Sequence, residues 1–192
     1  MCATYYIAVD EKEMAEIIDA VKKNAAHINI NTGDIYPKSV VPVFAKGEEG
    51  IYALPMMWGF PLKGKKSVSF NARSENIYRY PMYRNAKPVI IPASGFYEWK
   101  TEVDDRKQKY IFNALGEPVT FIAGLCSDFA ELEDGLFPMR FTMITAPPDE
   151  MFAEYHDRKP IVLDKEECWR WLETKSKEVL FEKPVELEVR AV

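Results

Sequence analysis

The chain has 192 residues, of which 47% are hydrophobic and 13% aromatic, which predicts one globular domain over residues 1–192 and excludes a disordered or low-complexity protein. Its 25 Lys and Arg against 30 Asp and Glu give a net charge of −5, so any nucleic-acid site must be a local patch. No apolar run approaches the roughly 20 residues of a membrane span, and three cysteines without CxxC spacing argue against a disulfide framework or a zinc site. We therefore expect a cytoplasmic protein with no membrane contact, no metal and no cofactor.

Apolar spacing predicts few helices and many short strands. Apolar residues three and four apart predict an amphipathic helix over 11–24. Further helical segments are expected at 148–155, which begins with a proline, and at 164–173, where Asp164 can cap the first turn. The fold class is then α+β, with mostly antiparallel pairing. Strands are predicted at 40–44, 50–53, 67–70, 89–91, 96–99, 109–112, 121–125, 139–145 and around 185–189.

Cys2 directly follows Met1, and this position gives it chemistry that an internal cysteine lacks. Methionine is normally trimmed before a small residue, so we expect the mature chain to begin with Cys2. An α-amine with a pKa of about 8 then lies beside a thiol with a pKa of about 8.5. Such an aminothiol condenses with an aldehyde, because the amine forms a Schiff base and the thiol closes a thiazolidine ring. The alternative is an inert cysteine in a frayed terminus.

The aromatic run at residues 95–99 contains one carboxylate, Glu98. Alternation along a strand places Glu98 with Phe96 on the face opposite the other two aromatic residues. A carboxyl that points inward among apolar groups has a raised pKa, which suits it to transfer protons near neutral pH. The alternative is a surface carboxylate paired with Lys87 or Lys100.

Two further polar segments contain candidate site residues. After the predicted strand 67–70, Asn71 offers a donor and an acceptor, and Arg73 offers a guanidinium that fits phosphate or carboxylate. The alternative there is a turn with an Arg73–Glu75 ion pair, and the residues alone leave both open. His156 lies beside two cations ahead of an apolar segment and is a candidate for acid–base work.

In their order along the chain these segments resemble the SRAP (SOS response-associated peptidase) family. The resemblance spans the whole chain and rests on Met1-Cys2, the NARSE run at 71–75, the GFYEW run at 95–99 and the HDRKP run at 156–160. The segment 36–43 is similar to the family's proline-bearing segment. The WGFP run at 58–61 is similar to its WGLxP motif.

The resemblance implies a barrel-like β-rich core with peripheral helices and a basic groove. It also implies recognition of abasic sites in single-stranded DNA, with a covalent thiazolidine link between the terminal cysteine and the ring-opened sugar, in the response to DNA damage. Lyase-type chemistry at the same centre is part of this expectation.

The roles of individual residues follow from the same resemblance. Cys2 is the nucleophile, Asn71 positions its amine, Glu98 transfers protons, and His156 assists sugar opening and reversal of the link. Contacts with the DNA strand are implied for Arg73, Trp58 and Pro37, and more weakly for Thr145 and Arg158.

The chain departs from the family pattern at several positions. Ala3 and Thr4 follow Cys2, where the family usually has glycine and arginine, so a phosphate-directed arginine is missing. Pro88 and Lys159 also depart from the usual residues. With a net charge of −5, we expect weaker or more salt-sensitive DNA binding than in a typical member.

Two other functions remain open from the sequence. A cysteine peptidase or amidohydrolase would use Cys2 to attack a carbonyl, with His156 or Glu98 as base and Asn71 helping to bind the oxyanion. A non-covalent single-stranded DNA-binding module would result if Met1 were retained, because the amine could not condense. We favour the crosslink because Arg73, Trp58 and the basic residues near His156 suit a nucleic-acid strand.

Overall fold

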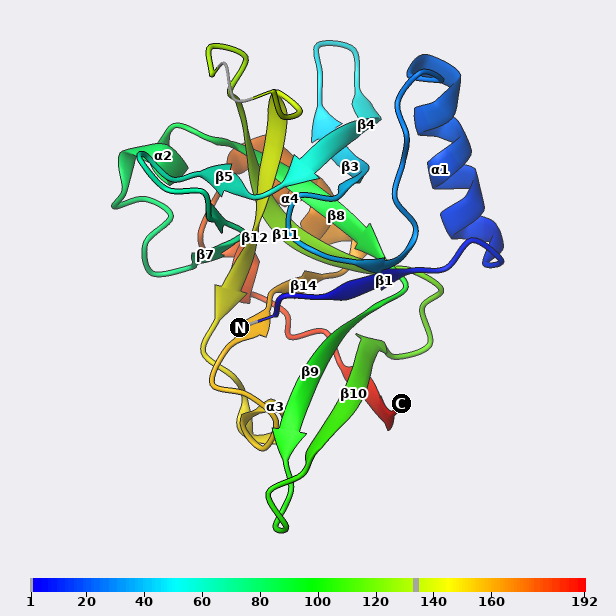
Figure 1. Ribbon diagram of the computed structural model, residues 1–192, viewed down its shortest axis with the longest axis vertical. Helices are drawn as coiled ribbons and strands as arrows, with labels where there is room; N and C mark the ends of the chain where they lie inside the picture. The colour runs from blue at the N-terminus through cyan, green and yellow to red at the C-terminus, as the bar shows by residue number, and fades with distance from the viewer. Residues whose placement is uncertain (1, 133–134) are drawn as a thin grey trace.

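The computed structural model describes residues 2–132 and 135–192, and five of its strands close into a barrel (Figure 1). Strand β12 hydrogen-bonds to both β4 and β11, and the pairs β4–β3, β3–β8 and β8–β11 complete the ring. The β12–β4 contact is parallel, and the other four are antiparallel. The barrel strands are β3 (Val40–Lys46), β4 (Ile51–Trp58), β8 (Lys87–Ala93), β11 (Thr120–Asp128) and β12 (Met139–Ala146).

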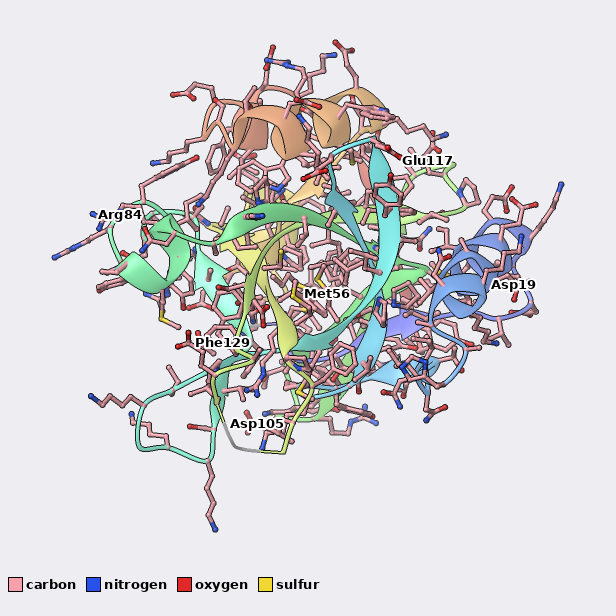
Figure 2. The ribbon with its side chains drawn as sticks, turned by 90° about the horizontal axis from the view of Figure 1, so that it is seen from above. Asp19, Met56, Arg84, Asp105, Glu117 and Phe129 are labelled. Atoms are coloured by element: carbon pink, nitrogen blue, oxygen red, sulfur yellow. The ribbon has the colours of Figure 1, made fainter. Side chains whose placement is uncertain are left out.

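Alternation along these strands builds two apolar cores. Val89 and Ile91 of β8 belong to one buried cluster together with Met56, which Figure 2 labels in the middle of the barrel viewed from above. The intervening Ile90 belongs to a second cluster, between the barrel and helix α4 (Lys165–Thr174). Successive residues of β8 therefore point alternately into the barrel and toward helix α4, and both faces of the strand are buried.

A second sheet lies against the barrel and carries the amino-terminal strand. Its order is β15 (Leu187–Ala191), β10 (Lys107–Ala114), β9 (Gly95–Thr101), β1 (Tyr5–Ile7) and β2 (Gly33–Ile35), with every pair antiparallel. Strand β9 follows β8 after only Ser94, so it leaves the barrel directly into this sheet. The N–H of Tyr97 donates to the carbonyl of Thr4 at 3.0 Å, which extends the β1–β9 contact toward the start of the chain.

The helices lie on the outside of the strands (Figure 1). Asp164 and Glu167 form a reciprocal capping box at the start of α4, as the sequence predicts, and the indole N–H of Trp171 donates to the carbonyls of Val89 and Gly124. None of the helices in the described residues is both long and apolar enough to cross a membrane. The remaining elements are α1 (Lys12–Asn24), α2 (Pro81–Arg84), α3 (Glu150–Ala153), the 3-10 turn η1 (Val179–Phe181), β5 (Phe60–Pro61), β6 (Val68–Ser69), β7 (Asn71–Arg73), β13 (Lys159–Pro160) and β14 (Val162–Leu163).

The α+β class, the barrel-like core and the mostly antiparallel pairing are confirmed, whereas the segments 148–155 and 67–70 differ from expectation. The segment 148–155 contains only the four-residue helix α3. The segment 67–70 is not one strand, because β6 ends at Ser69 and Asn71 begins β7, which pairs in parallel with β12. Asn71 therefore lies within a strand instead of in a turn, and its backbone is fixed by the barrel.

Candidate active site

Three segments far apart in the sequence meet at the start of the chain. Cys2 is fully buried, and its carbonyl accepts a hydrogen bond of 2.7 Å from Nδ2 of Asn71. Its thiol donates to the carbonyl of Thr4 at 3.4 Å. Figure 1 shows the beginning of the chain between β7 and β9. The candidate nucleophile and the candidate positioning residue are thus in direct contact.

Glu98 lies on the inner face of β9, as strand alternation predicts. It is 3% exposed and Phe96 is fully buried. On the opposite face Trp99 is 39% exposed, whereas Tyr97 is only 6% exposed. Burial raises the pKa of Glu98 from an ordinary value of 4.5 to about 7. Burial also raises the pKa of the Cys2 thiol, and the nearby Glu98 carboxylate adds to this effect. The carboxyl and the thiol therefore share one apolar environment.

His156, the other titratable candidate, lies just after α3. Burial lowers the pKa of its imidazole, which is therefore mainly neutral at pH 7. Its Nδ1 lies 2.7 Å from Oδ1 of Asp157 and 3.1 Å from the backbone N–H of Arg158. These two contacts require different tautomers, because Nδ1 donates to a carboxylate but accepts from an N–H. Asp157 also raises the pKa of Glu98, so the segment that contains His156 and Asp157 lies near the Glu98 carboxyl.

Asn71 and Glu98 each have a buried oxygen that lacks a hydrogen-bond partner among the described residues. These oxygens are Oδ1 of Asn71 and Oε1 of Glu98. Buried polar atoms are usually paired, so such atoms in a candidate site are available to a ligand or to the reacting groups. Asn71 can thus hold the backbone of Cys2 with Nδ2 while Oδ1 accepts from an amine.

The guanidinium of Arg158 binds groups of the protein itself, which does not agree with its expected contact with DNA phosphate. It is 6% exposed, its two terminal nitrogens lie 2.7 and 2.9 Å from the oxygens of Glu75, and one of them donates to the carbonyl of Thr145 at 2.6 Å. This bidentate pair lowers the pKa of Glu75 to about 2. Glu75 is therefore paired with Arg158, instead of with Arg73 as the alternative for the NARSE run proposed. Thr145 is itself fully buried, so its expected phosphate contact does not fit its position either.

Trp58 is a core residue, which does not agree with its expected contact with DNA bases. It is fully buried, its indole N–H donates to the carbonyl of Phe70 at 2.7 Å, and its ring stacks on Phe141 with centroids 6.3 Å apart. The ring also meets the edge of Tyr5, at a centroid distance of 5.1 Å. Trp58 thus packs in the core between Tyr5 and Phe141, and neither face of its ring is exposed to a base.

Trp58→Phe separates these two roles. It is expected to lower the free energy of unfolding by about 1–3 kcal/mol, because it removes the buried indole hydrogen bond to the Phe70 carbonyl, which keeps only its bond from the N–H of Met143, and opens a small cavity. The affinity for a single-stranded oligonucleotide should change less than twofold. Chemical denaturation and fluorescence anisotropy measure the two quantities. A large loss of affinity without a loss of stability would restore the predicted DNA contact.

Arg73 and Pro37 are accessible. The side chain of Arg73 is exposed at the end of β7, two residues after Asn71. Pro37 is half-buried in the turn before β3, next to Tyr36, which is 54% exposed. Both side chains can therefore be reached by a single-stranded DNA that also reaches Cys2.

Sequence reasoning missed Tyr5. This side chain is fully buried, and its hydroxyl has no hydrogen-bond partner among the described residues. Burial raises its pKa, and the Cys2 thiol is the second cause, so the phenol and the thiol are neighbours. The three-residue strand β1 is too short for an alternation pattern, and no signal in the sequence placed Tyr5 beside the site.

Comparison with curated proteins identifies several relatives. The chain is 29% identical over 144 residues to the abasic site processing protein YedK of Escherichia coli, a match that covers 72% of this chain and 63% of YedK. It is 33% identical over 129 residues to the abasic site processing protein YobE of Bacillus subtilis, covering 63% of this chain and 58% of YobE. The matched region thus spans about three fifths of these relatives.

Solved structures share the fold. A protein from Bacteroides thetaiotaomicron superposes with a TM-score of 0.78 at 19% identity, covering 100% of this chain and 92% of that one. A protein from Bordetella bronchiseptica superposes with a TM-score of 0.74 at 21% identity, covering 100% of this chain and 99% of that one. The family model described as SOS response associated peptidase (SRAP) matches residues 1–192. The chain therefore belongs to the SRAP family.

Proposed function

We propose that this protein recognises abasic sites in single-stranded DNA and joins them covalently to Cys2, after removal of Met1, as a thiazolidine. The proposal rests mainly on the position of Cys2, whose carbonyl is held by Asn71 beside the raised-pKa carboxyl of Glu98. The names of YedK and YobE, which call them abasic site processing proteins, support the same substrate.

The chemistry begins at the amine. The unprotonated α-amine of Cys2, which donates a hydrogen bond to Oδ1 of Asn71, attacks the aldehyde carbon of the open sugar and forms a carbinolamine. Glu98, about half protonated at pH 7, donates its proton to the carbinolamine hydroxyl, which leaves as water and gives the Schiff base. The Cys2 thiol then adds to the imine carbon. Its proton returns to the Glu98 carboxylate, the nitrogen takes up the electron pair of the C=N bond and keeps its own proton, and the five-membered ring closes without any oxidant or reductant.

His156 acts on the sugar before and after this sequence. Because its imidazole is mainly neutral at pH 7, it can take the proton of the anomeric hydroxyl and give it to the ring oxygen as the bond between that oxygen and C1′ breaks and the aldehyde forms. In the reverse direction it returns that proton. At the Schiff-base stage, removal of a proton from the carbon next to the imine expels the 3′ phosphate, which gives lyase-type strand cleavage at the same centre.

The thiol itself argues against the peptidase alternative. A cysteine peptidase attacks as a thiolate and needs a lowered cysteine pKa. Here burial and the Glu98 carboxylate raise the pKa of Cys2. A thiol that reacts second, on an imine formed by its own amine, does not need to be ionised beforehand.

The deciding experiment mixes the protein with a single-stranded oligonucleotide that contains one abasic site. Intact mass first establishes that the chain begins with Cys2. We expect a product that survives denaturation and whose mass equals the sum of both partners minus one water. The matched control is the same oligonucleotide after borohydride reduction of its aldehyde, which should give no product. Failure of the processed chain to give any product, or turnover of a peptide through a trapped thioester, would contradict the proposal.

A further inference from the structure

Four lysines gather on two neighbouring turns that lie outside the catalytic cluster. The turn before β3 carries Lys38, and the loop between β5 and β6 carries Lys63, Lys65 and Lys66. All four are exposed, and none takes part in an ion pair among residues 2–132 and 135–192. We call these four residues the lysine cluster. In a chain of net charge −5, an uncompensated group of this kind is a local cationic patch.

The two turns are fastened to each other and to the core. The N–H of Lys38 donates to the carbonyl of Trp58 at 2.7 Å, and its ammonium donates to the carbonyl of Lys66 at 3.1 Å. The hairpin β5–β6 begins after Gly59, where φ is +119° and a Cβ would lie only 2.4 Å from the side chain of Val68, so no other residue fits there. Figure 2 shows the loop of this hairpin projecting from the body of the molecule, with the nitrogen tips of its side chains pointing outward.

Lys38 occupies a backbone position that favours glycine. The N–H of Ser39 donates to the carbonyl of Tyr36 at 3.0 Å, Pro37 is second in the turn, and Lys38 has a φ of +77°. This is the pattern of a type II turn, whose third residue is normally glycine because a Cβ is strained there. A lysine at this position costs stability, and residues in strained conformations often have a functional role.

The lysine cluster lies within reach of the proposed site. Lys66 is five residues before Asn71, so their Cα atoms are no more than about 18 Å apart. Asn71 in turn holds the carbonyl of Cys2. A DNA strand that places a sugar at Cys2 therefore needs only a few nucleotides to bring its phosphates to the loop. The exposed ring of Tyr36, in the same turn as Lys38, offers a surface on which a base can stack.

We propose that the lysine cluster binds the phosphates of the DNA strand on one side of the abasic site. This inference rests on the proposed function, and it names the surface that holds the same substrate. Exposed lysines beside an aromatic ring are the features with which proteins bind single strands without sequence preference. The cluster therefore supplies affinity, and the Cys2 site supplies the selectivity for the lesion.

The test measures binding apart from crosslinking. In a Cys2→Ala background, the triple variant Lys63→Gln, Lys65→Gln, Lys66→Gln is compared with the triple variant Lys23→Gln, Lys107→Gln, Lys177→Gln. The second set removes the same charge from exposed lysines elsewhere on the chain. Anisotropy of a labelled single-stranded oligonucleotide, with and without an abasic site, is recorded over a range of salt concentrations. We expect the loop variant to bind about tenfold or more weakly at low salt, with a salt slope smaller by about 2, since each lost phosphate contact on a single strand contributes about 0.7.

Each outcome of this comparison is decisive. Equal weakening in both triple variants would overturn the inference, because the effect would then be one of total charge. Unchanged binding by the loop variant would overturn it as well, while leaving the crosslinking proposal intact. Loop-specific weakening, together with no crosslink by the chain that keeps a processed Cys2, would support the cluster as a DNA surface and contradict the proposed function instead.

Lys38→Gly tests the strained member of the cluster separately. Glycine relieves the backbone strain, and the lost hydrogen bond from the Lys38 ammonium to the Lys66 carbonyl is exposed to solvent and contributes little, so the melting temperature should stay the same or rise, whereas the affinity for the oligonucleotide should fall severalfold. A gain in stability with unchanged affinity would overturn the assignment of Lys38 to the surface.

Discussion

Cys2→Ala is expected to abolish the product that survives denaturation, while leaving the first half of the reaction intact. The variant keeps an α-amine at the same position, so it can still form a Schiff base with the sugar aldehyde. Without the thiol the ring cannot close, and the imine returns to aldehyde and amine in water. We therefore expect no product after denaturation in the absence of a reductant.

Reductive trapping separates the roles of the amine and the thiol. With cyanoborohydride present, Cys2→Ala should give a covalent product, because the reduced imine is a stable secondary amine. The matched control is Cys168→Ala, which removes a half-buried thiol with a raised pKa from helix α4 and should crosslink like the wild type. A Cys2→Ala chain that crosslinks without reductant would assign the chemistry to another group. One that cannot be trapped would show that the amine is not the first nucleophile.

The parts of this site that sequence could predict are those fixed by local periodicity. Alternation along the 95–99 run is enough to turn Glu98 inward with Phe96, because adjacent residues of a strand always point to opposite faces. The capping box of α4 is equally local, since Asp164 and Glu167 satisfy each other's backbone groups within one turn.

The parts that sequence could not predict depend on contacts between distant segments. Nothing in the HDRKP run shows that the Arg158 guanidinium binds Glu75, 83 residues away, instead of a phosphate. Nothing around Trp58 shows which side of β4 faces the core, because aromatic residues are suited to both a barrel interior and a DNA surface. The hydrogen-bond partners of Arg158 and Trp58 determine where these side chains lie. These partners become neighbours only when β12 closes the barrel and pairs with β7.

Glu98→Gln is expected to slow crosslinking by about 100-fold or more and at the same time to stabilise the fold above neutral pH. The rate should fall because glutamine cannot protonate the departing hydroxyl of the carbinolamine or accept the thiol proton, and general acid–base groups contribute about 10²–10⁴-fold. The wild-type rate should decline as Glu98 loses its proton, around its pKa of about 7. This decline should be absent in the variant.

The sign of the stability effect follows from the raised pKa of Glu98. Between an ordinary value of 4.5 and about 7, the folded chain binds a proton at Glu98 that the unfolded chain has released. The free energy of unfolding therefore decreases as the pH rises through this window and levels off above it. At about 1.4 kcal/mol for each pKa unit, the wild type is less stable at pH 8 than at pH 4.5 by about 3 kcal/mol through this group alone.

Glutamine has no charge to bury, so the variant should lack this decline. Denaturant unfolding at pH 5 and pH 8 measures the difference, with Glu186→Gln as the matched control, because that carboxylate is exposed in the described structure and its removal should change neither rate nor stability. A Glu98→Gln chain that is destabilised at pH 8 and crosslinks at the wild-type rate would mean that Glu98 is a structural residue. A slower and more stable variant would show that the buried carboxyl reduces the stability of the fold in exchange for a proton available near neutral pH, as expected of a group that serves the reaction.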